Sequence, residues 1–154
     1  MPLIKEKLYE NIMRIVIYPN SQRDAAIRWS NALDDYCNDL LFPSTTHQQA
    51  KSAFISMFMT MNYNTDGRII FQNCFNVYAA ALAPGMLPGT QMPNLFQASV
   101  PPVNINLFPY YNFCYNNASN MEECIKKLVD IVHPWFLTGL LTYSYTPYAT
   151  INWQ

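Results

Sequence analysis

The sequence predicts a mainly α-helical protein, a single domain over residues 1–154 with about four helices, a long loop and an extended C-terminal tail. Apolar residues recur at i, i+3, i+4 and i+7 in four segments after residue 20, which is the period of a helix with one buried face. A short helix of mixed charge is expected before them, at residues 3–16. Residues 84–119 contain six of the eleven prolines, which indicates a loop. Residues 138–154 are rich in threonine, tyrosine and isoleucine, which favour extended strands.

The first two helices lie within the first 41 residues. Residues 3–16 are predicted to form a short helix of mixed charge. Ser21 is the expected N-cap of the second helix, because Asp24 follows at the spacing of a capping box. The apolar stripe of this helix continues to Leu41, and Pro43 is expected to end it.

The third and fourth helices are separated by turn residues that end at Asp66-Gly67. Thr45 or Thr46 is the expected cap of the third helix. The fourth, about 68–83, is apolar on nearly every side. From Ile69 onward, its polar interruptions are Gln72, Asn73 and Asn76. A helix this apolar is central in the fold, in contact with another chain, or both.

Residues 84–118 form a predicted arm. Connections longer than about 15 residues without regular structure are uncommon in compact domains and are usually functional or disordered. Disordered chains are poor in aromatic residues, whereas this segment contains Phe96, Phe108, Tyr110, Tyr111, Phe113 and Tyr115. We therefore expect the arm to be ordered by packing over its own helices or over a neighbouring subunit.

The last helix is predicted over about 119–137, opened by a capping box of Ser119 and Glu122. Its outer face carries two i,i+4 pairs of opposite charge, Glu122–Lys126 and Glu123–Lys127. Pro134 should end or kink the helix. The tail, residues 138–154, is predicted to add as a β-strand to another molecule, or to pair within the loop region.

Charge is unevenly distributed along the chain. Charged residues make up 12% of the sequence, and none lies within residues 69–121 or, apart from the titratable His133, within residues 131–154. Ionised side chains normally keep a surface soluble and monomeric, so these segments are expected to lie against protein, as in a subunit of an assembly. The net charge of −1 argues against nucleic acid as the main ligand. No apolar run has the roughly 18 residues of a membrane span.

The sequence contains little that points to catalysis. The four cysteines, without a C-x-x-C pair, are expected to be buried free thiols. His47 is expected to face solvent, His133 to be structural, and Asp34-Asp35 to lie on a solvated face. No phosphate-binding, dinucleotide-binding, zinc-protease or serine-hydrolase motif occurs. We therefore expect a protein that is not an enzyme and that has no cofactor or metal site.

Several strings of the sequence resemble those of a known family. They are Trp29, Ala32 and Tyr36 with Pro43-Ser44-Thr45-Thr46 and Ala50-x-x-Ala53-Phe54; Tyr78-Ala79-Ala80-x-Leu82-Ala83-x-Gly85-Met86; Pro101-Pro102; Trp135-Phe136-x-Thr138-Gly139; and Thr150-Ile151-Asn152-Trp153. On these strings, which cover most of the chain, the sequence resembles the small virion structural proteins of tailed bacteriophages. The resemblance implies a component of the tail, baseplate or head–tail neck, and it implies no catalytic residue.

These observations together predict a repeated structural subunit of a phage virion, synthesised in the host cytoplasm. Its partners would be other copies of itself and other virion proteins. The expected subunit contacts come from the arm and the tail: Met86, Phe96, Phe108, Tyr110, Tyr111, Phe113, Tyr143, Tyr145, Ile151 and Trp153. Truncation after Gly139 is expected to reduce assembly and leave the helical core, about 3–83 and 119–137, folded. The alternative is a small monomeric enzyme or ligand-binding helical domain with a pocket under the 84–119 loop.

Overall fold

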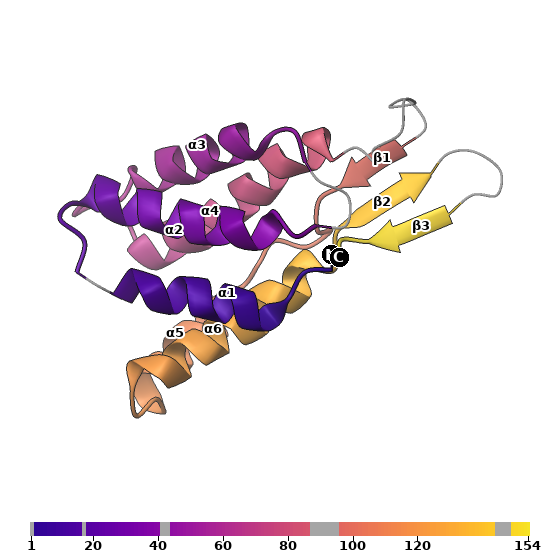
Figure 1. The fold of residues 1–154 in the computed structure, drawn as a ribbon. Helices are drawn as coiled ribbons and strands as arrows, with labels where there is room; N and C mark the ends of the chain where they lie inside the picture. Colours follow the sequence, from indigo (N-terminus) through magenta and orange to yellow (C-terminus); the bar gives the residue numbers. More distant parts are fainter. Residues whose placement is uncertain (1, 17, 41–43, 87–95, 144–148) are drawn as a thin grey trace.

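A computed structural model describes residues 2–16, 18–40, 44–86, 96–143 and 149–154. Within them the fold is mainly α-helical, as predicted, with one small sheet (Figure 1). The α-helices are α1 (Lys5–Met13), α2 (Gln22–Cys37), α3 (His47–Phe58), α4 (Gly67–Leu82), α5 (Phe108–Asn116) and α6 (Met121–Phe136). Short 3-10 helices are η1 (Arg14–Val16) and η2 (Ala83–Gly85), and the strands are β1 (Phe96–Ser99), β2 (Leu140–Tyr143) and β3 (Ala149–Asn152).

The N-cap of α2 is as predicted, whereas that of α6 is shifted by one residue. Ser21 Oγ accepts a hydrogen bond from the backbone N–H of Asp24 at 3.0 Å. In α6 the cap is Asn120, whose side-chain oxygen accepts from the N–H of Glu123 at 3.0 Å, while the Glu123 carboxylate accepts from the N–H of Ser119 at 2.7 Å. The predicted box of Ser119 and Glu122 is therefore wrong, although the capping chemistry is of the expected kind.

The start of α3 is held by tertiary contacts instead of by a local cap. Thr46 occupies the N-cap position but makes no capping hydrogen bond. Its hydroxyl donates to the carbonyl oxygen of Ala81 at 2.7 Å, and the hydroxyl of Ser44 donates to that of Leu82 at 2.7 Å. Thr46 therefore starts α3 at a predicted position, but its hydroxyl does not cap the helix, because it and the hydroxyl of Ser44 satisfy free carbonyls at the end of α4.

The helices form an array in which each packs on its neighbours in space (Figure 1). Helix α3 lies along α4 and α2, α2 lies along α1, and α6 packs against both α1 and α5. One face of α4 is buried, through Cys74, Phe75, Tyr78, Ala79 and Leu82. Pro134 does not end α6, which continues to Phe136.

The arm is more regular than predicted. Its described part contains β1 and α5, so the expectation of a long connection without secondary structure is wrong there; residues 87–95 lie outside the described residues. Strand order is β1-β2-β3, antiparallel throughout, with Ser99 opposite Leu140 and Leu141 opposite Ile151. Of the two predicted outcomes for the tail, pairing within the loop region is the one the structure has. In Figure 1 the sheet projects from one end of the helical array.

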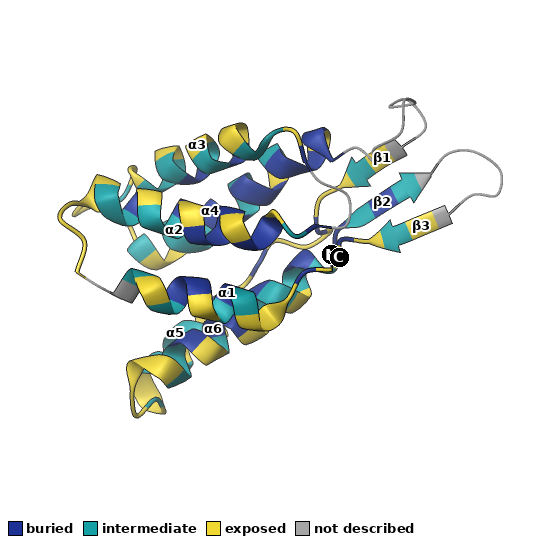
Figure 2. Ribbon diagram, viewed as in Figure 1, coloured by how far each residue is buried: buried dark blue, intermediate teal, exposed yellow. Residues whose placement is uncertain are grey.

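The core is aromatic, and Phe136 lies at its centre. Its ring makes edge contacts with Tyr36 of α2 and Tyr78 of α4, with centroids 6.0 and 6.4 Å apart, and lies 6.2 Å from the indole of Trp153. All four side chains are fully buried. Helices α2, α4 and α6 and the C-terminal tail therefore share one core, which runs through the interior seen in Figure 2.

Candidate subunit interface

Helix α5 is the most unusual surface element of the protein. Five of its nine residues are aromatic, none is charged, and none is buried. A helix on the outside of a domain normally presents charged residues to water. The exposed part of α5 has instead the composition of a protein contact surface, since aromatic residues are enriched in interfaces and charged residues are depleted.

Two amide side chains of α4 attach the segment that leads into α5. Asn76 Oδ1 accepts from the backbone N–H of Ile105 at 3.0 Å, and Gln72 Oε1 accepts from that of Leu107 at 2.8 Å. The side chains of Ile105 and Leu107 are buried in the core. Two of the polar interruptions in the apolar sequence of α4 therefore satisfy backbone donors, which fixes where α5 lies.

Two apolar hollows meet beside α5 at Trp29 and Tyr110. The first, of about 300 Å³, is lined by Trp29, Phe58, Met61, Gly67, Arg68, Phe71, Tyr110 and Tyr111. The second, of about 290 Å³, is lined by Ile12, Ile15, Tyr18, Pro19, Trp29, Tyr110, Met121 and Ile125. We call the joined surface the Trp29 groove.

The Trp29 groove is nearly free of charge. Its charged lining residue, Arg68, is paired with Asp66 at 2.8 Å. The floor of the groove is firm, because the rings of Trp29 and Phe71 pack edge to face with centroids 5.0 Å apart. An apolar partner could therefore enter the groove without leaving an unpaired charge buried.

Large apolar side chains are exposed along the uncharged segment 69–121. Those of Tyr115, Val103 and Met121 are 91%, 72% and 56% exposed. Ile69, Val100 and Phe108 are also exposed. Figure 2 shows the turn between α5 and α6 as an exposed end of the molecule. We call these exposed side chains and the Trp29 groove, taken together, the surface around α5.

Two of the predicted contact residues belong to the chain's own core, which corrects the prediction for them. Met86 and Trp153 are 2% and 1% exposed. Met86 follows η2, and its backbone forms an isolated bridge to Ser44. The indole of Trp153 lies against Gly139, and the backbone N–H of Trp153 donates to the carbonyl oxygen of Gly139 at 2.9 Å. Neither side chain is available to a neighbouring subunit.

The other predicted contact residues are distributed over two places. Phe108, Tyr110, Tyr111 and Phe113 lie together on α5, exposed or half-buried. Ile151 is half-buried in β3. The backbones of Phe96 and Tyr143 are opposite each other in β1 and β2, and Tyr145 lies outside the described residues. Trp29 and Met121, which also line the groove, were not among the predicted contact residues, although the i, i+3, i+4 position of Trp29 in α2 indicated an apolar face.

Asp34 is buried, which corrects the expected solvated face, and His47 is paired with it instead of facing solvent. His47 Nδ1 lies 2.6 Å from Asp34 Oδ1, the hydroxyl of Tyr78 donates to the same oxygen at 2.8 Å, and Lys51 Nζ is 3.8 Å from Oδ2. Burial alone would raise the pKa of Asp34, but the hydrogen bonds from His47 and Tyr78 hold it below the ordinary value. The carboxylate thereby joins α2, α3 and α4.

A second polar contact joins α2 to α6. The hydroxyl of Tyr36 lies 2.6 Å from His133 Nδ1. Burial lowers the pKa of His133, and the positive charge of Lys5 lowers it further. Burial raises the pKa of Tyr36, so its hydroxyl stays protonated and can donate to the neutral imidazole. This geometry fits the structural role expected for His133.

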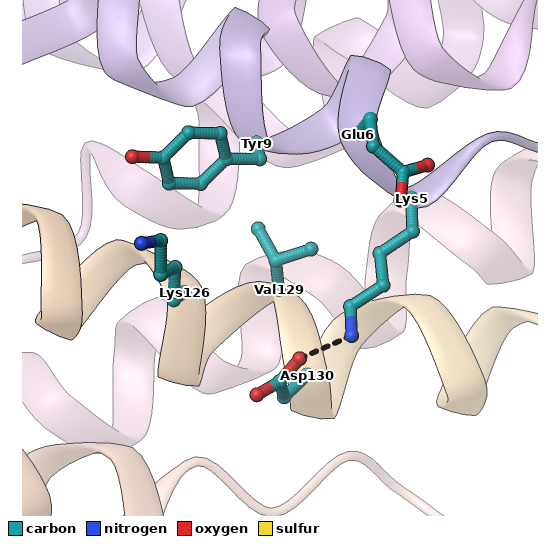
Figure 3. Close-up of a pocket in the computed structure, with 6 residues that line it drawn as sticks. All are labelled: Lys5, Glu6, Tyr9, Lys126, Val129 and Asp130. Atoms are coloured by element: carbon teal, nitrogen blue, oxygen red, sulfur yellow. Dashed lines mark ion pairs between the residues drawn. The ribbon is translucent and has the colours of Figure 1, made fainter.

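A charged hollow of about 280 Å³ lies between α1 and α6 (Figure 3). Lys5 reaches across from α1 to form an ion pair with Asp130. Lys126 Nζ is 5.9 Å from the ring centroid of Tyr9, and Lys127 Nζ is equally far from that of Phe113. The predicted pairs with Glu122 and Glu123 are not among the ion pairs of the described residues; the lysines lie over aromatic rings instead.

Within the described part of the chain, no three His, Cys, Asp or Glu residues are grouped so that they could hold a metal ion. No helix of that part combines the length and the apolar character of a membrane-crossing segment. In comparisons with protein-family models, curated proteins and solved structures, nothing matched this chain.

Proposed function

We propose that this chain is a non-enzymatic structural subunit of a bacteriophage virion, in the tail, baseplate or neck, and that its copies assemble through the surface around α5. The observation that carries the proposal is α5 itself, an aromatic helix with no charge and no buried residue. The resemblance of the sequence to small virion proteins is the reason for proposing a bacteriophage virion as the assembly.

The energetics of the surface favour contact with protein. Burial of apolar area yields about 25 cal/mol per Å² removed from water, and large exposed apolar patches on soluble proteins mark interaction sites. Aromatic side chains provide wide contact area with few torsions to immobilise. Tyr115 and Val103 would therefore stabilise a contact at low entropic cost.

A second copy of this chain is the occupant that best fits the surface. The chain offers two apolar elements of different shape, the concave Trp29 groove and the exposed side chains of Val103 and Tyr115. Neither presents an unpaired charge to the other. Contact between different patches of identical subunits is heterologous, and it closes into a ring where the rotation permits.

The experiment is light scattering on the purified chain over a range of concentrations. Wild type should form oligomers whose mass rises with concentration. Tyr115→Lys and Val103→Lys should shift the molecule toward the monomer by at least tenfold in dissociation constant, because each would bury a lysine charge. Tyr63→Lys is the matched control, since Tyr63 is fully exposed outside the uncharged segment. A monomer at all concentrations, or equal effects of all three variants, would refute self-assembly through this surface.

The virion itself is tested by mass spectrometry of purified phage particles after chemical cross-linking. Particles should contain the chain in many copies, with cross-links between copies near α5. Lysine is absent from α5, so a photo-activated cross-linker placed at position 115 is the suitable probe. Particles that lack the chain would overturn the virion assignment even where the purified protein oligomerises.

A hollow of about 260 Å³ favours a second candidate, a ligand-binding domain. It lies between α4 and residues 100–104, and its lining is Asn76, Val77, Ala79, Ala80, Val100, Pro101, Asn104 and Trp135. No ionisable side chain is among these residues, so the site suits a small apolar ligand better than acid–base catalysis. A stable monomer in the scattering experiment would favour this candidate.

A further inference from the structure

Helices α5 and α6 form a hairpin that brings two cysteines to the same level. The helices pack together and are joined by the short turn 117–120. Cys114 lies two residues before the end of α5, and Cys124 lies three residues after the start of α6. Residues at similar distances from the turn of a helical hairpin face each other, because both helices rise 1.5 Å per residue.

Both cysteines are half-buried, and Cys124 is near enough to Cys114 to raise its pKa. Burial raises the pKa of Tyr110, one helical turn before Cys114, to about 12, and the nearby thiols of Cys114 and Cys124 contribute to this rise. The other two cysteines, Cys37 and Cys74, are fully buried. Cys114 and Cys124 are therefore the thiols that a small reagent can reach.

We propose that Cys114 and Cys124 are a disulfide-forming pair, which a low-molecular-weight disulfide such as glutathione disulfide converts into a covalent bridge between α5 and α6. The proposal depends on the hairpin geometry and is independent of the proposed function. The bridge would hold α5 against α6. Because Tyr110 of α5 lines the Trp29 groove, the bridge would also hold that side of the groove in place.

The chemistry is a two-step thiol–disulfide exchange. The thiolate of one cysteine attacks glutathione disulfide, which forms a mixed disulfide and releases one glutathione. The thiolate of the other cysteine then attacks the protein sulfur of that mixed disulfide and releases the second glutathione. Two protein thiols are oxidised to one disulfide, and one glutathione disulfide is reduced to two thiols.

The reaction should be slow at neutral pH and should accelerate as the pH rises. Burial, together with the proximity of Cys124, raises the pKa of Cys114 to about 12. Because the thiolate is the nucleophile, the exchange rate follows the thiolate fraction, which grows tenfold per pH unit below the pKa. Attack by Cys114 is therefore slow at neutral pH and faster in alkaline solution.

The test is to incubate the folded chain with glutathione disulfide at about pH 8.5, near the ordinary pKa of a thiol. Free thiols are then alkylated under acid quench and the peptides mapped by mass spectrometry. A single Cys114–Cys124 disulfide is expected, with Cys37 and Cys74 alkylated only after unfolding. In Cys114→Ser, Cys124 should retain glutathione. Oxidation should also slow hydrogen exchange in the amides of α5.

Three results would overturn the proposal. Stable glutathione adducts on Cys114 or Cys124 of wild type would mean that the two sulfur atoms cannot meet. A disulfide to Cys37 or Cys74 would mean that another pair is preferred. Thiols that stay free in the folded chain, while the unfolded chain reacts, would mean that the pair is closed to the oxidant.

Discussion

The most direct test of the fold is the replacement of Trp153, the penultimate residue of the sequence, by alanine. Its side chain is 1% exposed, packs 6.2 Å from the ring of Phe136, and lies over Gly139. A buried tryptophan removes roughly 150–250 Å² from water, which at about 25 cal/mol per Å² corresponds to roughly 4–6 kcal/mol. After partial collapse of the cavity, we expect a loss of about 3–5 kcal/mol in the free energy of unfolding.

The measurement is equilibrium unfolding in urea or guanidinium chloride, followed by circular dichroism and fluorescence. A loss of this size should also lower Tm by roughly 6–20 °C in a domain of this length. Tyr63→Ala is the control, because the fully exposed Tyr63 lies outside the proposed contact surface and its loss should change stability by less than about 0.5 kcal/mol. A loss below about 1 kcal/mol for Trp153→Ala would refute the placement of the tail in the core. On the same reasoning, truncation after Gly139 should destabilise the helices instead of leaving them intact.

Two further predictions concern Asp34 and the cap of α6. The pKa of Asp34 in the folded protein lies below its ordinary value. The ionised carboxylate therefore stabilises the folded state above about pH 4, the ordinary pKa of an aspartate. This stability is lost as the pH falls through the folded-state pKa. Unfolding free energies measured between about pH 6 and pH 3 should therefore fall more steeply for wild type than for Asp34→Asn, and parallel pH profiles would contradict the network with His47 and Tyr78. Asn120→Ala should lower the free energy of unfolding by about 1 kcal/mol and Ser119→Ala by much less, because the side chain of Asn120 caps α6. A larger loss for Ser119→Ala than for Asn120→Ala would mean that Ser119 is the cap, as predicted from the sequence.

The sequence predicted the helices well because their signals are local. The apolar stripe of α2 and the Ser21 cap are properties of residues within one or two turns of each other. The cap of α6 was misplaced by one residue because Ser119 and Asn120 are both good caps and only the backbone conformation selects between them. Strand β1 and helix α5 were missed because short elements between prolines lack a periodic signal.

The candidate interface was predicted in part, from the distribution of charge along the chain instead of from local helix signals. The absence of charge over residues 69–121 pointed to α5, and the structure has four of the predicted aromatic residues on that helix. The same reasoning failed for Met86 and Trp153, which are covered by their own chain. Trp29 was missed as a surface residue, since a helical stripe alone does not show which of its positions the neighbouring helices leave open.

By itself, the sequence determined a helical protein with long stretches free of acidic and basic residues, 69–121 above all, because periodicity and charge are read from neighbouring residues. Only the tertiary structure decided which apolar residues are satisfied inside the chain. Pairing of β2 with β1, burial of Trp153 beside Phe136 and attachment of residues 105–107 to Gln72 and Asn76 join positions far apart in sequence. The sequence pattern around an apolar residue is the same whether the residue is buried by its own chain or by another copy. The surface that remains exposed around α5 is therefore known only from the tertiary structure.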